Sequence, residues 1–138
     1  AAIFKCPDCG REVGGKDWVC PKGHKGYDGM SGLYSVKSSP PVPMAFGDPK
    51  DPNDFKPRSV KRAIKASKVL EVNAIAMGCA IFRKGLFKNV PKPWFDTGDS
   101  YTQDIYFCKK AKQAAGARFG VHCGVLVGHL DVNSSEIV

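Results

Sequence analysis

Val69-Leu-Glu-Val72, followed by Ala74-Ile-Ala-Met-Gly-Cys-Ala-Ile-Phe82, is rich in residues that favour buried strands. A glycine at position 78 interrupts this stretch. Because glycine has no side chain, it lets another group approach the backbone closely. We therefore expect strands over 69–82, broken near Gly78, and these buried strands set the class of the fold.

A helix is predicted downstream of these strands, over 101–115. It has a start signal, since Ser100-Tyr-Thr-Gln103 matches a capping box, in which the serine and glutamine side chains satisfy the first free N–H groups. Gly116 supplies a stop signal, and three lysines precede it at the negative end of the helix dipole. The face expected to cover the sheet carries residues at helical spacing, namely Tyr101, Ile105, Cys108, Ala111 and Ala115.

Weaker patterns predict the remaining elements. Strands are expected near 31–37 and, as two short pieces, over 118–127, and a short basic helix is expected over 61–68. Residues 47–58 have the composition of a mobile loop, and residues 133–138 that of a fraying tail. Together these elements predict an α+β fold in which a helix covers one face of a sheet.

Four potential metal ligands lie close together near the start of the chain, where Cys6-Pro-Asp-Cys9 is followed by Cys20-Pro-Lys-Gly-His24. Three thiolates and an imidazole at this spacing can close a tetrahedron around zinc. Four protein ligands leave no position for water, so the metal would be structural and would replace a missing hydrophobic core. Free cysteine turns without metal, or a redox Cys-x-x-Cys, are the alternatives. We expect a zinc-ribbon-like knuckle over 1–28 and a second part over 29–138.

The composition is that of an ordinary globular protein, with 43% apolar and 25% charged residues among 138. Lys and Arg number 21 against 13 Asp and Glu, giving a formal charge of +8, which favours an anionic partner such as a nucleotide, a nucleic acid or a lipid head group. No apolar run reaches the roughly 18 residues that span a bilayer. Cys79, Cys108 and Cys123 are predicted to be buried free thiols. We expect a soluble protein of the cytoplasm.

A series of motifs runs through the second part of the chain. In order, they are Gly32-Leu-Tyr34 with Pro40-Pro-Val-Pro43, Val72-Asn-Ala-Ile-Ala-Met-Gly-Cys-Ala-Ile-Phe-Arg-Lys84, Phe87 with Pro93-Trp-Phe95, Gln103-Asp-Ile-Tyr-Phe-Cys-Lys-Lys-Ala111 with Ala115-Gly116, and Val127-Gly-His129. This series resembles the C-terminal half of the glycosyltransferase family 2-like proteins of GT-A fold, most sharply over 69–130. The resemblance implies a partial GT-A-type mixed α/β sheet domain. It also implies transfer of a sugar from a nucleotide-sugar donor to an acceptor hydroxyl.

The resemblance also implies roles for individual residues. Asp104 matches the general base that takes the proton from the acceptor hydroxyl in an inverting displacement. His129 matches the histidine that joins an Asp-x-Asp motif around Mn²⁺ or Mg²⁺, where the metal neutralises the leaving nucleoside diphosphate. Gln103 stands where the family has a glutamate, and with Trp94 and Gly78 it is a candidate substrate-binding residue.

Structural roles would account for the same residues. Asp104 in the first turn of a helix is a favourable charge for the helix dipole. His129 would then be an ordinary hydrogen-bonded histidine, and Trp94, between a proline and a phenylalanine, would pack in the core instead of stacking on a sugar ring. These alternatives stay open at the level of the sequence.

The donor-binding half of the family is not found in the chain. None of the aspartates from Asp8 to Asp131 has a second aspartate two positions away, and the knuckle stands where the donor half is expected. The chain is then a fragment, a subunit completed by a protein partner or by self-association, or a reduced domain that has lost catalysis. The alternative from another functional class is a non-enzymatic zinc-stapled binding or assembly protein that contacts nucleic acid or protein.

Overall fold

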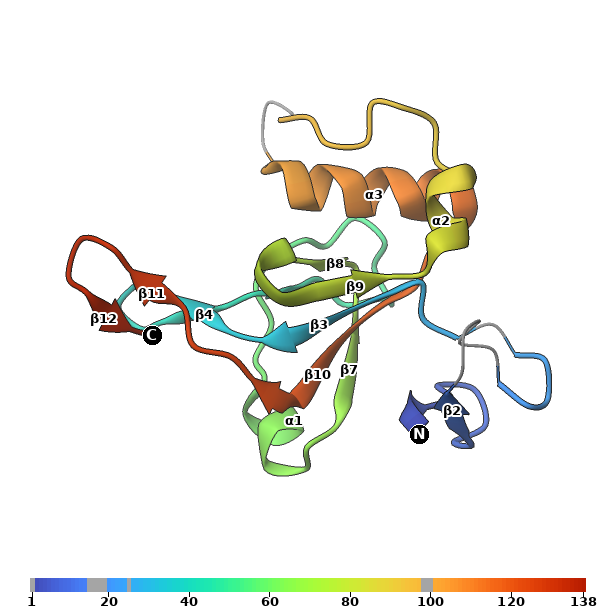
Figure 1. Cartoon of the computed structure of the whole chain (residues 1–138), viewed down its shortest axis with the longest axis horizontal. Coiled ribbons are helices and arrows are strands. Elements are labelled where there is room, and N and C mark those ends of the chain that lie inside the picture. The colour runs from blue at the N-terminus through green and yellow to red at the C-terminus, as the bar shows by residue number, and fades with distance from the viewer. Residues whose placement is uncertain (1, 15–19, 25, 98–100) are drawn as a thin grey trace.

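A mixed four-stranded sheet forms the centre of the molecule (Figure 1). The computed structural model describes residues 2–14, 20–24, 26–97 and 101–138. The strand order is β7-β10-β3-β9, in which β10 and β3 are parallel and each outer strand is antiparallel to its neighbour. The strands are β3 (Gly29–Leu33), β7 (Val69–Val72), β9 (Ala80–Phe82) and β10 (Phe119–Leu126). The predicted α+β class is confirmed at this level, and the GT-A assignment stays a prediction.

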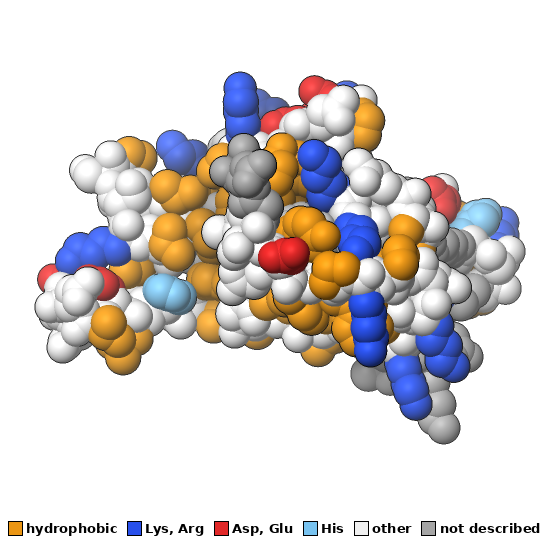
Figure 2. Space-filling model, turned by 90° about the horizontal axis from the view of Figure 1, so that it is seen from above, with side chains coloured by type: hydrophobic (Ala, Val, Ile, Leu, Met, Phe, Trp, Pro, Cys, Tyr) orange, Lys and Arg blue, Asp and Glu red, His pale blue; other side chains and the backbone are white. Residues whose placement is uncertain are grey.

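One long helix, α3 (Gln103–Ala115), forms a layer above the sheet (Figure 1). Phe107 and Cys108 of α3 are fully buried and share one hydrophobic core with Phe119 of β10. The Phe107 ring also stacks on Phe87, with ring centroids 5.2 Å apart. Figure 2 looks down on this layer and shows hydrophobic side chains that reach the surface among Lys and Arg side chains. The predicted helix therefore covers one face of the sheet, as expected.

The helix ends as predicted but begins differently. Gly116 adopts the left-handed conformation, with φ 59 and ψ 35, and closes α3. At the other end Thr102 precedes the first helical residue, Gln103, and its side chain makes no capping hydrogen bond. The Thr102 hydroxyl donates to the Asp104 carboxylate instead. The helix thus begins at Gln103 instead of position 101, and Ser100 of the predicted capping box lies outside the described residues.

The knuckle packs against part of the second face of the sheet. Its strands β1 (Ala2–Lys5) and β2 (Glu12–Gly14) form an antiparallel pair. A small core there joins Tyr27, Met30 and Val69 to buried residues of the knuckle. Beside this core a hollow remains open, lined among others by Ile81, His122 and Val125. The knuckle thus covers only a part of this face of the sheet.

Short elements occupy the connections. Tyr34 separates β3 from β4, so the strand predicted over 31–37 is two pieces, whereas β10 is one strand where two were predicted. The predicted basic helix is confirmed but ends earlier. The other elements are β4 (Ser35–Val36) paired with β5 (Val42–Pro43), β6 (Ala45–Phe46) paired with β8 (Ala74–Ile75), α1 (Lys61–Lys65), a 3-10 turn (Met77–Cys79), and α2 (Lys84–Lys88). None of the described helices is long and apolar enough to cross a membrane.

The segment 47–58, predicted as a mobile loop, is held by a buried side chain. The amide nitrogen of Asn73 donates to the backbone carbonyls of Asp48, Asp51 and Asp54 at 3.0, 2.8 and 2.8 Å. A loop tied at three carbonyls to a fully buried residue is anchored to the core. The expectation of a mobile loop is therefore wrong.

The end of the chain forms a hairpin where a fraying tail was predicted. β11 (Leu130–Asp131) pairs with β12 (Glu136–Ile137). The ammonium of Lys37 lies 3.3 Å from Asp131 and 3.1 Å from Glu136, so one cation ties both strands. Such pairing across about a hundred positions leaves no local sequence pattern.

Candidate functional site

Two matching turns build the cluster of cysteines and histidine. The N–H of Gly10 donates to the Cys6 carbonyl at 2.8 Å, and the N–H of Gly23 donates to the Cys20 carbonyl at 2.7 Å. The φ angles of the two glycines are 73 and 82, a conformation that residues with side chains rarely adopt. The repeated Cys-Pro start followed by glycine thus encodes two similar turns, closed by hydrogen bonds over four and three positions.

Each turn directs a backbone N–H to a sulfur. The N–H of Asp8 lies 3.4 Å from Cys6 Sγ, and the N–H of Lys22 lies 3.4 Å from Cys20 Sγ. Desolvation by itself would raise the pKa of these two thiols, but the hydrogen bonds outweigh it and lower the pKa of both Cys6 and Cys20. The local backbone therefore favours the thiolate, which is the form that binds a metal.

The spacing of the ligand atoms fits a metal ion. Those of Cys6, Cys9, Cys20 and His24 all lie within 4.8 Å of one another. Cys9 Sγ is 3.3 Å from Cys20 Sγ, and Cys6 Sγ is 3.8 Å from His24 Nδ1. A tetrahedral zinc site with bonds of about 2.3 Å to sulfur has sulfur–sulfur edges of about 3.8 Å. The structure thus brings the predicted ligands together, and they could hold a metal such as zinc.

A chain of ion pairs joins the knuckle to the sheet. Asp8, which lies between the first two ligands, pairs with Arg118 at 3.1 Å, and Arg118 Nε donates to Glu71 at 2.6 Å. The backbone N–H of Arg118 donates at 2.9 Å to the fully buried carboxylate of Asp28, which also pairs with Arg83 at 2.5 Å. Sequence reasoning missed these residues, because charges that pair across tens of positions form no motif.

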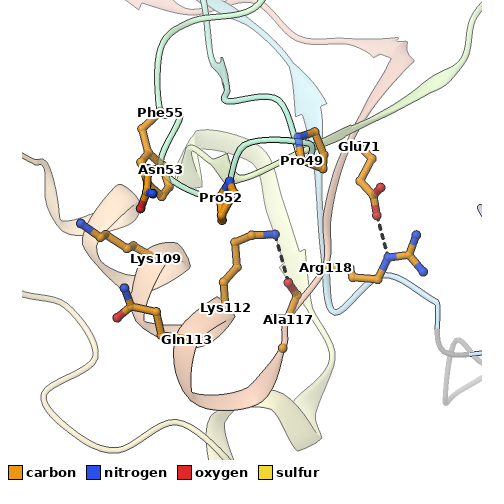
Figure 3. A pocket seen from close by; sticks show the side chains of 11 residues that line it. Pro49, Pro52, Asn53, Phe55, Glu71, Lys109, Lys112, Gln113, Ala117 and Arg118 are labelled. Atoms are coloured by element: carbon orange, nitrogen blue, oxygen red, sulfur yellow. Dashed lines mark hydrogen bonds and ion pairs between the residues drawn. The ribbon is translucent and has the colours of Figure 1, made fainter.

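Arg118 and Glu71 also line a pocket of about 520 Å³ (Figure 3). The Lys112 side chain extends into it and donates to the Ala117 carbonyl at 3.4 Å. Burial lowers the pKa of the Lys112 ammonium. The loop side of the pocket is formed by Pro49, Pro52, Asn53 and Phe55. Because Glu71 lies among the cations, the pocket carries charges of both signs and does not select one class of ligand.

A second cluster forms around Tyr34, directly after β3. Its hydroxyl accepts a hydrogen bond from the N–H of Gly78 at 2.9 Å, and its ring stacks on His129 with centroids 5.6 Å apart and planes 9° from parallel. Burial raises the pKa of Tyr34, and the negative charge of Asp104 raises it further. Two predicted site residues, Gly78 and His129, therefore contact a tyrosine to which the sequence assigned no role.

The carboxylate of Asp104 is held at one oxygen only. The Thr102 hydroxyl and the Ile105 N–H both donate to Oδ1, the latter at 2.9 Å. Oδ2 has no hydrogen-bond partner among the described residues. Asp104 is half-buried and His129 is exposed, so solvent reaches both. Gln103, the first residue of α3, precedes Asp104 and is exposed.

Gly78 has a clear steric reason to lack a side chain. A Cβ atom at this position would lie 2.6 Å from the ring and hydroxyl of Tyr34. The close approach that we expected at this glycine is thus the approach of the tyrosine. Gly78 serves the second cluster by making room for Tyr34.

Trp94 lies at the edge of the core. Its indole N–H donates to the Val90 carbonyl at 2.8 Å, and its ring packs edge-on against Phe87 at 5.0 Å. The Lys92 ammonium lies 5.0 Å from the ring centroid. These contacts favour the packing role over sugar stacking.

His129 stands apart from the metal-ligand cluster. In the described part of the chain, the one group of three or more His, Cys, Asp or Glu side chains with the spacing for a metal is that of the knuckle. A metal bound at His129 would therefore take its other ligands from outside the described residues.

Comparisons with known proteins identify a structure of similar fold but indicate no function. No protein-family model matches the chain, and no curated protein matches it. Among solved structures, the crystal structure of A197 from STIV matches with a TM-score of 0.55 and 16% sequence identity, over 82% of this chain and 51% of that one. The chain thus spans about half the length of that neighbour. At this identity the likeness shows a shared fold alone.

Proposed function

We propose that the chain carries the acceptor side of a glycosyltransferase site centred on Asp104, with the donor-binding half supplied by another segment or another chain. One observation carries this proposal. Gly78 and His129 contact Tyr34, and the charge of Asp104 acts on the same phenol, although these residues lie far apart in the sequence. Two of the motifs that the resemblance links to one activity thus contact a tyrosine of a third, which supports the proposal.

Asp104 has the properties of a general base. It lies in the first turn of α3, where a carboxylate interacts favourably with the helix dipole. Its Oδ1 is fixed by two hydrogen bonds, which leaves Oδ2 to accept the proton of an acceptor hydroxyl. As that hydroxyl oxygen bonds to the anomeric carbon, the bond from this carbon to the nucleoside diphosphate breaks.

Mn²⁺ or Mg²⁺, bound with the nucleotide-sugar, would neutralise the leaving diphosphate. His129 is the residue of this chain that would face such a metal, and one imidazole is a weak site for a hard cation that prefers oxygen ligands. The chain by itself should therefore transfer little sugar. The zinc of the knuckle takes no part in this chemistry, because its four ligands close the coordination sphere.

The test is sugar transfer from nucleotide-sugar donors by the protein together with its donor half. Asp104→Asn should lower turnover by about 10²–10⁴-fold, the usual contribution of a general base. Asp96→Asn is the matched control, because Asp96 is exposed and, among the described residues, its carboxylate accepts a hydrogen bond only from the adjacent Thr97 N–H. Full activity of Asp104→Asn would contradict the proposal.

A second pair of variants tests the cluster itself. Gly78→Ala places a methyl group against Tyr34 and should lower turnover, whereas Gly85→Ala, with no atom within 4 Å of the added carbon, should not. Equal activity of the two variants would exclude a role for the Tyr34 arrangement. A protein that only binds its partner, the alternative function, would bind equally well with Asp104→Asn.

A further inference from the structure

Helix α1 and the end of β10 form a surface that the proposed site does not use. The Lys68 N–H donates to the Ala63 carbonyl, and the Lys68 carbonyl accepts from the Cys123 N–H of β10, both at 3.0 Å. A Cβ added at Gly124 would lie 3.3 Å from the Ser67 side chain, so the end of β10 adjoins the turn after α1. We call this surface the basic tip, and it comprises Lys61, Arg62, Ile64, Lys65, Lys68, Val125 and Leu126.

The charges of the basic tip are unpaired. Its three lysines and one arginine are all exposed, and none makes a salt bridge with a described residue. By contrast, Lys37, Arg83 and Arg118 elsewhere each pair with carboxylates. No acidic residue occurs between positions 55 and 70. Four uncompensated cations on so small an area favour an anionic partner.

The same surface exposes aliphatic side chains. Ile64 is 38% exposed, Val125 47% and Leu126 66%. The tip has no aromatic ring, whereas proteins that bind single-stranded nucleic acid combine cations with aromatic side chains on which bases stack. Cations next to exposed aliphatic groups are instead the composition of surfaces that bind anionic membranes.

We propose that the basic tip binds the surface of a bilayer that contains anionic lipids. The cations would lie among the head groups and the aliphatic side chains at the boundary of the acyl chains. α1 has only five residues, so the attachment would be reversible and would weaken as salt screens the charges. In Figure 1, α1 and α3 lie on opposite sides of the central sheet, so α1 is remote from the helix that carries Asp104.

Cosedimentation with vesicles tests the proposal. The protein should pellet with vesicles of phosphatidylcholine containing about one third phosphatidylserine, and not with phosphatidylcholine alone. Each cation near an anionic surface contributes about fivefold in affinity. We would replace all four cations in one variant, Lys61→Gln, Arg62→Gln, Lys65→Gln, Lys68→Gln. Because about four factors of five multiply, this variant should bind the anionic vesicles several hundred-fold more weakly. Leu126→Ser should weaken the binding that persists at high salt.

A matched control distinguishes the effect of this patch on vesicle binding from the effect of the protein's total charge. Lys50, Lys56, Lys84 and Lys88 are exposed elsewhere, and replacing all four by glutamine gives the same formal charge, 8 − 4 = +4. This control should bind nearly as well as the unaltered protein. Equal losses in the two variants, or no preference for anionic vesicles, would overturn the proposal. Tighter binding of a single-stranded oligonucleotide through the same four residues would also overturn it and assign the tip to nucleic acid.

Discussion

Removing the metal, by chelation or by Cys9→Ser, should unfold the knuckle and leave the sheet and α3 folded. The knuckle core is small, and it is separate from the larger core that holds α3 and β10. A structural zinc supplies the folding free energy of such a module, so the module unfolds without it. The larger core does not depend on these ligands.

Unfolding of the knuckle should also lower the free energy of unfolding of the remaining domain, because it exposes two buried side chains. Tyr27 and Met30 are each 4% exposed under the knuckle. Exposing each costs about 1.5–3 kcal/mol, and loss of the partly exposed pair between Asp8 and Arg118 adds less than about 1 kcal/mol. The sum is about 3–7 kcal/mol and is an upper estimate, because the unfolded segment still shields some surface. At roughly 4 °C per kcal/mol for a domain of this size, the melting temperature should fall by about 12–28 °C.

Hydrogen exchange of metal-loaded and chelated protein measures this directly. Amides of residues 5–13 and 20–28 should lose protection, whereas those of 103–115 should keep it, and zinc content should fall from about one equivalent to near zero. Cys79→Ser is the control, because Cys79 lies outside the ligand cluster. Cys9→Ser protein with a full equivalent of zinc would refute the ligand assignment. Loss of protection throughout α3 would refute the separation of the two cores.

Two further predictions concern the stability of the larger domain. Asn73→Ala removes the donor to three loop carbonyls and should lower the free energy of unfolding by about 2–3 kcal/mol. The control is Asn53→Ala at an exposed position of the same loop, which should change the free energy of unfolding by less than about 0.5 kcal/mol. Equal stability of the two variants in urea unfolding would contradict the anchoring role of Asn73. Burial raises the pKa of Cys108 and of Tyr27, each to about 12, so these groups ionise in the unfolded chain near their usual 9.0 and 10.0 but not in the fold. The contribution of these two protonated groups to the free energy of unfolding is therefore complete below pH 9 and should be lost between pH 9 and 12. In urea titrations repeated across that range, Cys108→Ala should show a smaller loss of stability than the unaltered protein.

Local sequence patterns predicted the elements whose residues are close in the chain. The repeated Cys-Pro start and the short ligand spacing identified the knuckle, because each turn is completed within five residues. The end of α3 was predictable because a single glycine, Gly116, satisfies the left-handed position there. The strands over 69–82 followed from their apolar composition.

Such local patterns could not predict contacts between residues that are distant in the sequence. Asn73 resembles any polar residue between strands, and only the fold shows that it is fully buried beneath a loop. The hairpin at the end of the chain is contacted by Lys37, whose partner carboxylates are 94 and 99 positions away. Likewise, Tyr34 was one residue of a weak motif, and its contact with Gly78 spans 44 positions.

Strand β3 explains how the knuckle and the Tyr34 cluster share one scaffold without sharing chemistry. Asp28 precedes this strand and belongs to the ion-pair chain that reaches the knuckle, and Tyr34 follows it. Five residues of strand separate the two ends, which is about 17 Å. β3 is paired on both edges, with β10 and β9, so a disturbance at its first end is resisted by hydrogen bonds along its length. A metal in the knuckle would therefore stabilise one end of the strand, while Tyr34 at the other end contacts Gly78 and belongs to the larger core.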